Sequence, residues 1–246
     1  MTRSSTTRSI EVQGHRGARG LAPENTLAGF QLAIECGVDS IETDVHLSKD
    51  GVPVLCHDPR PAAGAPLLRE LTALELRDFA VPTLSDLFAL ADERVIFDLE
   101  LKRVPFVPEL IGDDYNGDGP GLLERRVAQA IEQAGVLHRT RVRSFDHRSV
   151  RAIRQLLPGI QTGLLTYHTA PADYAAHLAD AEMYCPHYLF VDEHIVQQVH
   201  AAGKRIIPYT VNEPAEWQRL VEWGVDGITT DFPDQLLKWL KEPRTK

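Results

Sequence analysis

Residues 15–58 read HRGARGLAPENTLAGFQLAIECGVDSIETDVHLSKDGVPVLCHD. Apolar residues recur at helical spacing in its first half, which predicts a helix over Glu24–Cys36 with Asn25 as the N-cap. The segment SIETDVHL predicts a strand over Ser40–Leu47, along which alternate side chains share a face. The stretch therefore pairs one helix with one strand and carries polar residues at both of its ends.

The rest of the chain repeats this alternation. Strictly alternating strands and helices predict a parallel sheet, and eight such units in about 250 residues predict a TIM (β/α)₈ barrel. We expect a single barrel domain over residues 11–246 and a flexible lead-in over residues 1–10. The predicted strands are Glu11–Gly14, Ser40–Leu47, Val95–Leu101, Arg141–Phe145, Gln161–Thr166, Tyr188–Val191, Arg205–Val211 and Gly227–Thr230.

The composition narrows the classes of function. The 246 residues are 43% hydrophobic and 25% charged, as is typical of a globular protein. The formal net charge of −9 disfavours nucleic acid as a partner, because nucleic-acid binders usually present a basic face. A small anionic substrate is still compatible with it, since a few local Arg and Lys side chains can override the net charge.

The cysteines and the hydropathy pattern indicate a compartment. Cys36, Cys56 and Cys185 show no CxxC spacing, which predicts small buried thiols and favours a reducing cytoplasm. No apolar run reaches the roughly 18 residues of a membrane span. The polar N-terminal segment lacks the apolar core of a signal peptide. We expect a cytoplasmic protein without stable membrane insertion. The sequence is compatible with a monomer and with a homo-oligomer.

Three carboxylates lie on two neighbouring predicted strands. Glu42 and Asp44 share a face of one strand, and Glu100 lies near the end of the next, where such barrels place their active sites. Like charges this close require a cation or a proton, and a set of carboxylates suits one hard cation, Mg²⁺ or Ca²⁺. The alternative is a group of salt-bridged acids. His46 is interpreted as a side chain at the barrel rim, with a fourth metal ligand as the alternative.

Two histidines and two basic residues accompany these acids. His15 and His57 each follow a short strand, and a pair of imidazoles can act as base and acid in one displacement. Arg16 and Lys102 would supply positive charge to an anionic group. Together these residues predict metal-assisted cleavage of a phosphoester. The sequence contains no GxSxG, GxGxxG or P-loop motif, and it leaves the order of acid and base open.

Asp114–Gly119 matches the first half of the EF-hand calcium-loop pattern. The pattern requires Glu six residues after Gly119, where Arg125 stands. A polar turn is the preferred interpretation, and binding of a second cation over Asp114–Asp118 is the alternative.

The blocks HRGARGLAPENT, IETDVHLSKDGVPVLCHD, LELK, SFD and GVDGITTDFP resemble the glycerophosphodiester phosphodiesterase family over nearly the whole chain. The resemblance implies a TIM barrel that uses one divalent cation, Mg²⁺ or Ca²⁺. Its substrates would be glycerophosphodiesters such as glycerophosphocholine and glycerophosphoethanolamine, and its products sn-glycerol 3-phosphate and an alcohol. The residues that it implies are Glu42, Asp44 and Glu100 as metal ligands, His15 and His57 as general base and acid, Arg16 and Lys102 as phosphate-binding groups, and Glu24 as a supporting acid.

Two departures from the family pattern concern the substrate. The segment after Asp58 is shortened to PRPAAGAPLLREL, which leaves open whether the pocket is more exposed. The seventh strand ends in Tyr209-Thr-Val-Asn212 where the family usually has Trp-Thr-x-Asn, so Tyr209 and Asn212 are candidates for shaping the glycerol site. One alternative is a related barrel phosphodiesterase or lyase that acts on lysophospholipids or other head groups. The other is a non-catalytic phosphate-binding barrel, which the complete set of site residues disfavours.

Overall fold

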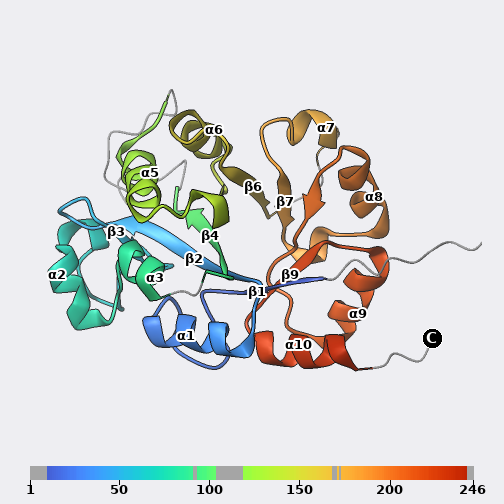
Figure 1. Ribbon diagram of the computed structural model, residues 1–246, viewed down its shortest axis with the longest axis horizontal. Helices are drawn as coiled ribbons and strands as arrows, with labels where there is room; N and C mark the ends of the chain where they lie inside the picture. Colours follow the sequence, from blue (N-terminus) through green and yellow to red (C-terminus); the bar gives the residue numbers. More distant parts are fainter. Residues whose placement is uncertain (1–9, 91–92, 104–118, 168–170, 172, 243–246) are drawn as a thin grey trace, which may run out of the picture.

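Eight parallel strands form a nearly closed barrel in the computed structural model, and helices surround it (Figure 1). The structure describes residues 10–90, 93–103, 119–167, 171 and 173–242. The strand order is β8-β7-β6-β5-β4-β2-β1-β9, and the short β3 pairs antiparallel with β2 outside this path. The predicted single-domain TIM barrel is confirmed.

The strands and helices alternate along the chain. The strands are β1 (Glu11–Gly14), β2 (Ser40–Leu47), β3 (Pro53–Leu55), β4 (Ile96–Leu101), β5 (Thr140–Ser144), β6 (Gln161–Thr166), β7 (Met183–Pro186), β8 (Arg205–Ile206) and β9 (Gly227–Thr230). The helices are α1 (Leu27–Cys36), α2 (Ala73–Leu76), α3 (Leu84–Leu90), α5 (Leu122–Ala134), α6 (His147–Leu156), α7 (Tyr174–His177), α8 (Glu193–Ala201), α9 (Pro214–Trp223) and α10 (Pro233–Lys241).

The barrel closes between β8 and β9 through irregular backbone. The strand predicted over Arg205–Val211 is correct only for its first two residues, because Pro208 has no N–H to offer a strand ladder. Single hydrogen bonds replace the ladder: Thr229 N donates to Pro208 O at 3.0 Å, and Val211 N donates to Thr229 O at 2.9 Å. The sheet therefore continues from β8 to β9 without a regular β-ladder.

The predicted strand Tyr188–Val191 is wrong. The sixth barrel strand is β7, which begins five residues earlier, and Tyr188–Phe190 forms a 3₁₀ turn after it. The apolar residues of this turn suggested burial, yet Leu189 is 64% exposed and Phe190 is 36% exposed. Packing in the core therefore does not explain why these two residues are apolar.

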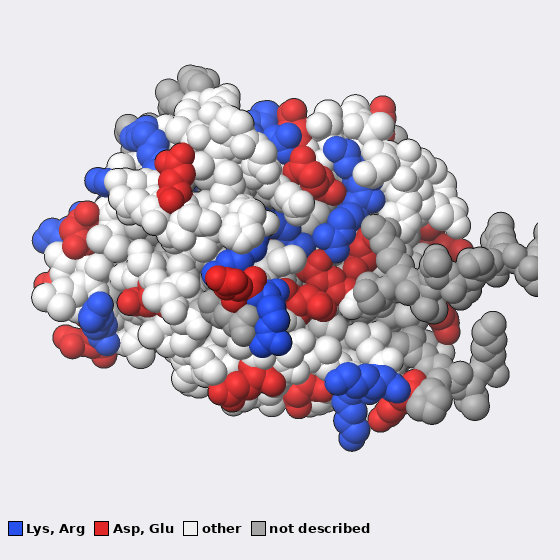
Figure 2. All heavy atoms as spheres, in the orientation of Figure 1, with Lys and Arg blue, Asp and Glu red and all other residues white. Residues whose placement is uncertain are grey.

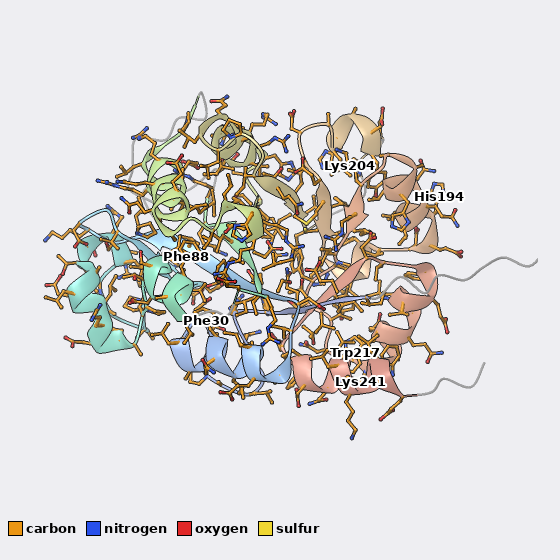
Figure 3. The ribbon with its side chains drawn as sticks, in the orientation of Figure 1. Phe30, Phe88, His194, Lys204, Trp217 and Lys241 are labelled. Carbon is orange, nitrogen blue, oxygen red and sulfur yellow. The ribbon has the colours of Figure 1, made fainter. Side chains whose placement is uncertain are left out.

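The main core lies between the barrel and its helices. Phe30 on α1 and Phe88 on α3 both face this layer (Figure 3) and are buried. Trp217 on α9 packs edge to face on Trp239 of α10 with ring centroids 5.9 Å apart. These contacts hold the helices around the sheet and fix where the strand ends lie.

The barrel interior is polar on the side of β1, β2, β4 and β5. TIM barrels usually fill this space with branched apolar side chains, whereas here Asp98 lies between Arg141 Nη2 at 3.1 Å and Arg143 Nε at 3.4 Å. Arg143 Nη2 also lies 3.5 Å from Glu42 Oε1. Burial lowers the pKa of Arg143, but the charges of Asp98 and Glu42 outweigh it and raise the pKa. This ion network forms the floor beneath the carboxyl ends of the strands.

Arg143→Met should lower the free energy of unfolding by about 3–5 kcal/mol, because the buried carboxylates of Glu42 and Asp98 would each lose a cationic partner. Arg154→Met is the matched control, since the Arg154–Glu182 pair lies at the surface, with side chains 37% and 40% exposed. Loss of this pair should cost at most about 1 kcal/mol. Urea unfolding followed by circular dichroism measures both, and equal midpoints for the two variants would contradict the role of the network.

Other sequence-based expectations have mixed outcomes. Cys185 is buried as expected, whereas Cys36 and Cys56 are partly buried, and all three are free thiols. Among the described residues, no helix is long and apolar enough to cross a membrane. Figure 2 shows Lys and Arg lying beside Asp and Glu on the face in view. The expected lead-in up to residue 9 and the EF-hand-like segment up to residue 118 lie outside the described residues.

Candidate active site

Three buried carboxylates converge at the carboxyl ends of β2 and β4. Asp44 and Glu100 are direct neighbours in the parallel register of these strands, and Glu42 lies two residues before Asp44 on the same face. One oxygen of each carboxylate lies within 4.8 Å of the others, and all three side chains are buried. The structure therefore brings together the three residues that the sequence predicted as ligands. This donor set fits a hard divalent cation, because all of its ligand atoms are oxygens.

Two basic side chains partly balance these acids. Lys102 Nζ lies 2.8 Å from Glu100 and 3.4 Å from Asp44, and Arg16 Nε lies 3.3 Å from Asp44. Burial tends to raise the pKa of Asp44, but Lys102 and Arg16 outweigh it and hold this pKa well below its usual range. The pKa of Glu100 is raised, because burial and the neighbouring acids outweigh Lys102. The site thus combines the ionised carboxylate of Asp44 with two basic side chains that can reach an anionic group.

The segment between β1 and α1 is held in an unusual backbone conformation. Arg16 and Asn25 have φ angles of 50° and 54°, the left-handed region that few residues other than glycine adopt. Arg16 N donates to Glu42 at 2.9 Å, and Asn25 Nδ2 donates to Asp44 at 2.9 Å. Such strain persists where surrounding contacts enforce it, often at functional sites. This segment positions two of the three carboxylates.

Asn25 is not the N-cap of α1, so that prediction is wrong. The helix begins later than predicted, and Thr26 caps it by accepting a hydrogen bond from Gly29 N at 3.1 Å. The Asn25 side chain instead accepts from Thr43 at 2.7 Å inside the site. Glu24 binds Arg16 Nη1 with both of its oxygens at 2.9 Å, so it orients this guanidinium.

His15 is buried beside the carboxylates and is held from behind by Asp231. Its Nδ1 lies 2.6 Å from Asp231 Oδ1, and its Nε2 lies 3.9 Å from Glu42. Asn212 donates to the second oxygen of Asp231 at 2.8 Å and accepts from the Asp231 N–H at 2.9 Å. A carboxylate on Nδ1 favours the tautomer with its proton there, so Nε2 is left as the base. Asn212 therefore orients Asp231.

His57 lies at the rim after β3. Its Nδ1 lies 2.7 Å from Asp58, and its side chain is 35% exposed. A pocket of 410 Å³ adjoins it and continues under the shortened segment after Asp58, lined also by Asn25, Pro61 and Phe79. His46 lies behind: it is buried, its Nε2 is 3.2 Å from the His57 carbonyl, and burial lowers its pKa to about 4. His46 is therefore neutral at pH 7 and lies outside the carboxylate cluster.

Tyr209 stands at the rim beyond β8. Its hydroxyl donates to the Thr166 carbonyl at 3.0 Å, and its ring packs against His187 and Phe145. Burial and the charge of Glu100 raise its pKa. The aromatic ring of Tyr209 thus packs against side chains that follow β5 and β7.

Sequence reasoning left several of these residues without a role. Asp231 follows the last strand, and its contact with His15 spans 216 positions. Arg143 alternates with Arg141 along β5, and two charges on the inward face of a buried strand were a signal of an internal ion network. Asn25 belongs to the motif PENT, and its interpretation as an N-cap left no reason to expect its contacts with Asp44 and Thr43.

Known proteins match the chain along most of its length. The model of the glycerophosphoryl diester phosphodiesterase family matches residues 15–235. A glycerophosphodiester phosphodiesterase of Caldanaerobacter subterraneus subsp. tengcongensis is 30% identical over 250 residues, which cover 94% of this chain and 98% of the relative.

Solved structures agree in fold. An Oleispira antarctica phosphodiesterase in complex with the product sn-glycerol-3-phosphate superposes with a TM-score of 0.82 at 25% identity, covering 94% of this chain and 97% of the other. A glycerophosphodiester phosphodiesterase of Parabacteroides distasonis gives a TM-score of 0.78 at 25% identity, covering 94% and 96%. The chain therefore belongs to the glycerophosphoryl diester phosphodiesterase family and is a phosphodiesterase built on a TIM barrel.

Proposed function

We propose that this enzyme hydrolyses glycerophosphodiesters, among them glycerophosphocholine and glycerophosphoethanolamine, to sn-glycerol 3-phosphate and an alcohol, with one divalent cation. The observation that carries the proposal is the buried cluster of Glu42, Asp44 and Glu100 beside Lys102 and Arg16. The sn-glycerol-3-phosphate bound to the Oleispira phosphodiesterase supports the choice of product.

The three carboxylates would hold Mg²⁺ or Ca²⁺, since both cations prefer oxygen ligands. Such a cation would act as a Lewis acid on a phosphoryl oxygen. Lys102 and Arg16 would bind the remaining charge of the phosphate, and Arg16 can do so in a fixed orientation because Glu24 holds its guanidinium.

The two histidines would move the protons. We assign His15 as the base, because it is buried next to the carboxylates and Asp231 leaves its Nε2 free to take a proton from the attacking water. We assign His57 as the acid, because it adjoins a pocket with room for the departing alcohol. One P–O bond forms to the attacking oxygen and one breaks to the alcohol, whose oxygen receives the proton of His57.

The three free thiols support a reducing compartment, and we place the reaction in the cytoplasm. The non-catalytic alternative is disfavoured, because a degenerate barrel should have lost at least one of these carboxylates or histidines.

The test is release of sn-glycerol 3-phosphate from glycerophosphocholine. Activity should disappear after treatment with EDTA, because the carboxylate cluster would lose its cation, and it should return with Mg²⁺, Ca²⁺ or Mn²⁺ added in turn. Melting curves recorded in parallel should show an upward shift when the effective cation is added, because a ligand of the native state stabilises it. Full activity in EDTA would rule out the proposed role of the cation.

A further inference from the structure

Six side chains, five of them aromatic and one a leucine, lie on the rim beyond β5 to β8. This part of the barrel lies across from β3 (Figure 1). Ring centroids lie 4.7 Å apart for Tyr167 and His187, and 5.7 Å apart for His187 and Tyr209. We call this surface the aromatic wall, and its members are Phe145, Tyr167, His187, Leu189, Phe190 and Tyr209.

The aromatic wall is exposed although it is apolar. Leu189 is 64% exposed and Tyr167 60%, and Phe145 and Phe190 are 40% and 36% exposed. These four are half of the eight large hydrophobic side chains that are exposed in the described part of the chain. Single exposed hydrophobic residues are common, whereas a contiguous group beside an active site marks a binding surface.

Hydrogen bonds between strand ends fix the wall in place. His187 N donates to Thr166 O at 2.9 Å, Tyr188 N donates to Tyr209 O at 2.8 Å, and Tyr209 N donates to Pro186 O at 3.0 Å. The Tyr209 hydroxyl donates to the same Thr166 carbonyl. The surface is therefore formed before any ligand arrives, so binding on it requires little ordering.

The wall suits an apolar chain better than a cationic head group. Its rings pack edge to face against one another, with centroids 4.7 to 6.1 Å apart, so each ring covers part of its neighbour. His187 is also uncharged at neutral pH, since burial lowers its pKa and its Nδ1 accepts a hydrogen bond from Leu189 N. None of the six members carries a charge.

The position of the wall indicates which part of the substrate it contacts. Under the proposed function, the departing alcohol lies at His57 and its pocket. The other organic group of the diester is the glycerol, and it would extend toward the opposite rim, where Tyr209 packs against His187 and Phe145. We propose that the aromatic wall binds an acyl or alkyl chain attached to this glycerol, so that the preferred substrates are monoacyl or monoalkyl glycerophosphodiesters. This inference rests on the proposed function and deepens it.

The test compares three soluble diesters at concentrations below micelle formation. They are glycerophosphocholine, its 1-octanoyl derivative, and glycerophospho-octanol, in which the apolar chain is on the departing alcohol. We expect a kcat/KM about tenfold or more higher for the octanoyl derivative than for glycerophosphocholine, because burial of its chain adds binding free energy. Glycerophospho-octanol should show a smaller gain.

Variants of the aromatic wall test whether it causes the preference for the octanoyl derivative. Tyr167→Ser combined with Leu189→Ser should lower the octanoyl-to-unacylated ratio of kcat/KM about tenfold, mainly through KM. Tyr167→Phe combined with Leu189→Met keeps the apolar area and should retain the ratio. Leu74→Ser on α2 is the matched control, because Leu74 is 76% exposed and belongs to a different surface.

Several results would overturn the inference. These are equal kcat/KM for the acylated and unacylated diesters, a ratio that the serine variant leaves unchanged, and a dependence on the wall only for glycerophospho-octanol. A serine variant that alters only self-association or sedimentation with phosphatidylcholine vesicles would make the wall a docking surface instead.

Failure of the proposed function is distinguishable from failure of this inference. If wild type hydrolyses none of the three diesters with Mg²⁺, Ca²⁺ or Mn²⁺, the proposed function fails. Calorimetric titration with 1-octanoyl-glycerol 3-phosphate then tests the wall by itself. Binding that weakens about tenfold in the serine variant supports the wall, and equal binding by both proteins overturns it.

Discussion

Asp44→Asn should lower kcat/KM for glycerophosphocholine by about 10³-fold or more, since a metal ion acting on a phosphoryl oxygen supplies several kcal/mol of transition-state stabilisation. Asp44 lies within 4.8 Å of both other carboxylates and contacts Lys102 and Arg16. The amide keeps the shape of the side chain but removes its charge, so both the cation and the two basic residues lose a partner. Initial rates at saturating metal measure the effect.

Metal binding provides an independent measurement for the same variant. Isothermal titration should show that Asp44→Asn binds Mg²⁺ or Ca²⁺ much more weakly, and its melting temperature should no longer rise with added cation. Asp180→Asn is the matched control, because Asp180 is exposed before the start of β7, at the end of the barrel opposite the acids. Metal affinity equal to that of wild type in Asp44→Asn would exclude this carboxylate as a ligand.

His15→Gln and His57→Gln should differ in their response to the leaving group. Each should lower kcat about 10²–10⁴-fold for glycerophosphocholine, because each removes a proton-transfer group. A diester whose leaving group is 4-nitrophenol needs no acid, so His57→Gln should recover most of its activity with this substrate. His15→Gln should stay inactive, because the nucleophile still needs a base. The ratio of rates with the two substrates measures the difference.

Asp231→Asn tests the assignment of His15 as the base, because Asp231 is the partner of its Nδ1. The amide can accept a hydrogen bond but carries no charge, so His15 would lose the group that fixes its tautomer and orientation. The expected loss of kcat is about 10–100-fold, and it should be absent when His15 is already Gln. Recovery of His15→Gln, rather than His57→Gln, with 4-nitrophenol as leaving group would reverse the assignment of base and acid.

Much of the fold followed from local patterns, and its errors have local causes. The strand Ser40–Leu47 was predicted with its observed bounds, because eight residues of alternating character leave little choice of structure. The sixth barrel strand was misplaced, because the apolar residues after Pro186, among them the exposed Leu189 and Phe190, looked more like a buried strand than β7 itself. A run of apolar residues normally indicates a buried segment, whereas Leu189 and Phe190 lie exposed at the rim of the barrel.

The sequence by itself determined the barrel, the reaction class and the strand ends that carry Glu42, Asp44 and Glu100, since strand periodicity and short motifs are local properties of the chain. Only the tertiary structure decided which distant residues meet: Asp231 behind His15, Asn25 on Asp44, Arg143 beneath Glu42, and the aromatic wall beyond β5 to β8. These contacts depend on the register and curvature of a closed sheet. No local pattern encodes them, because each contact joins segments that become neighbours only when the strands and loops assemble into the barrel.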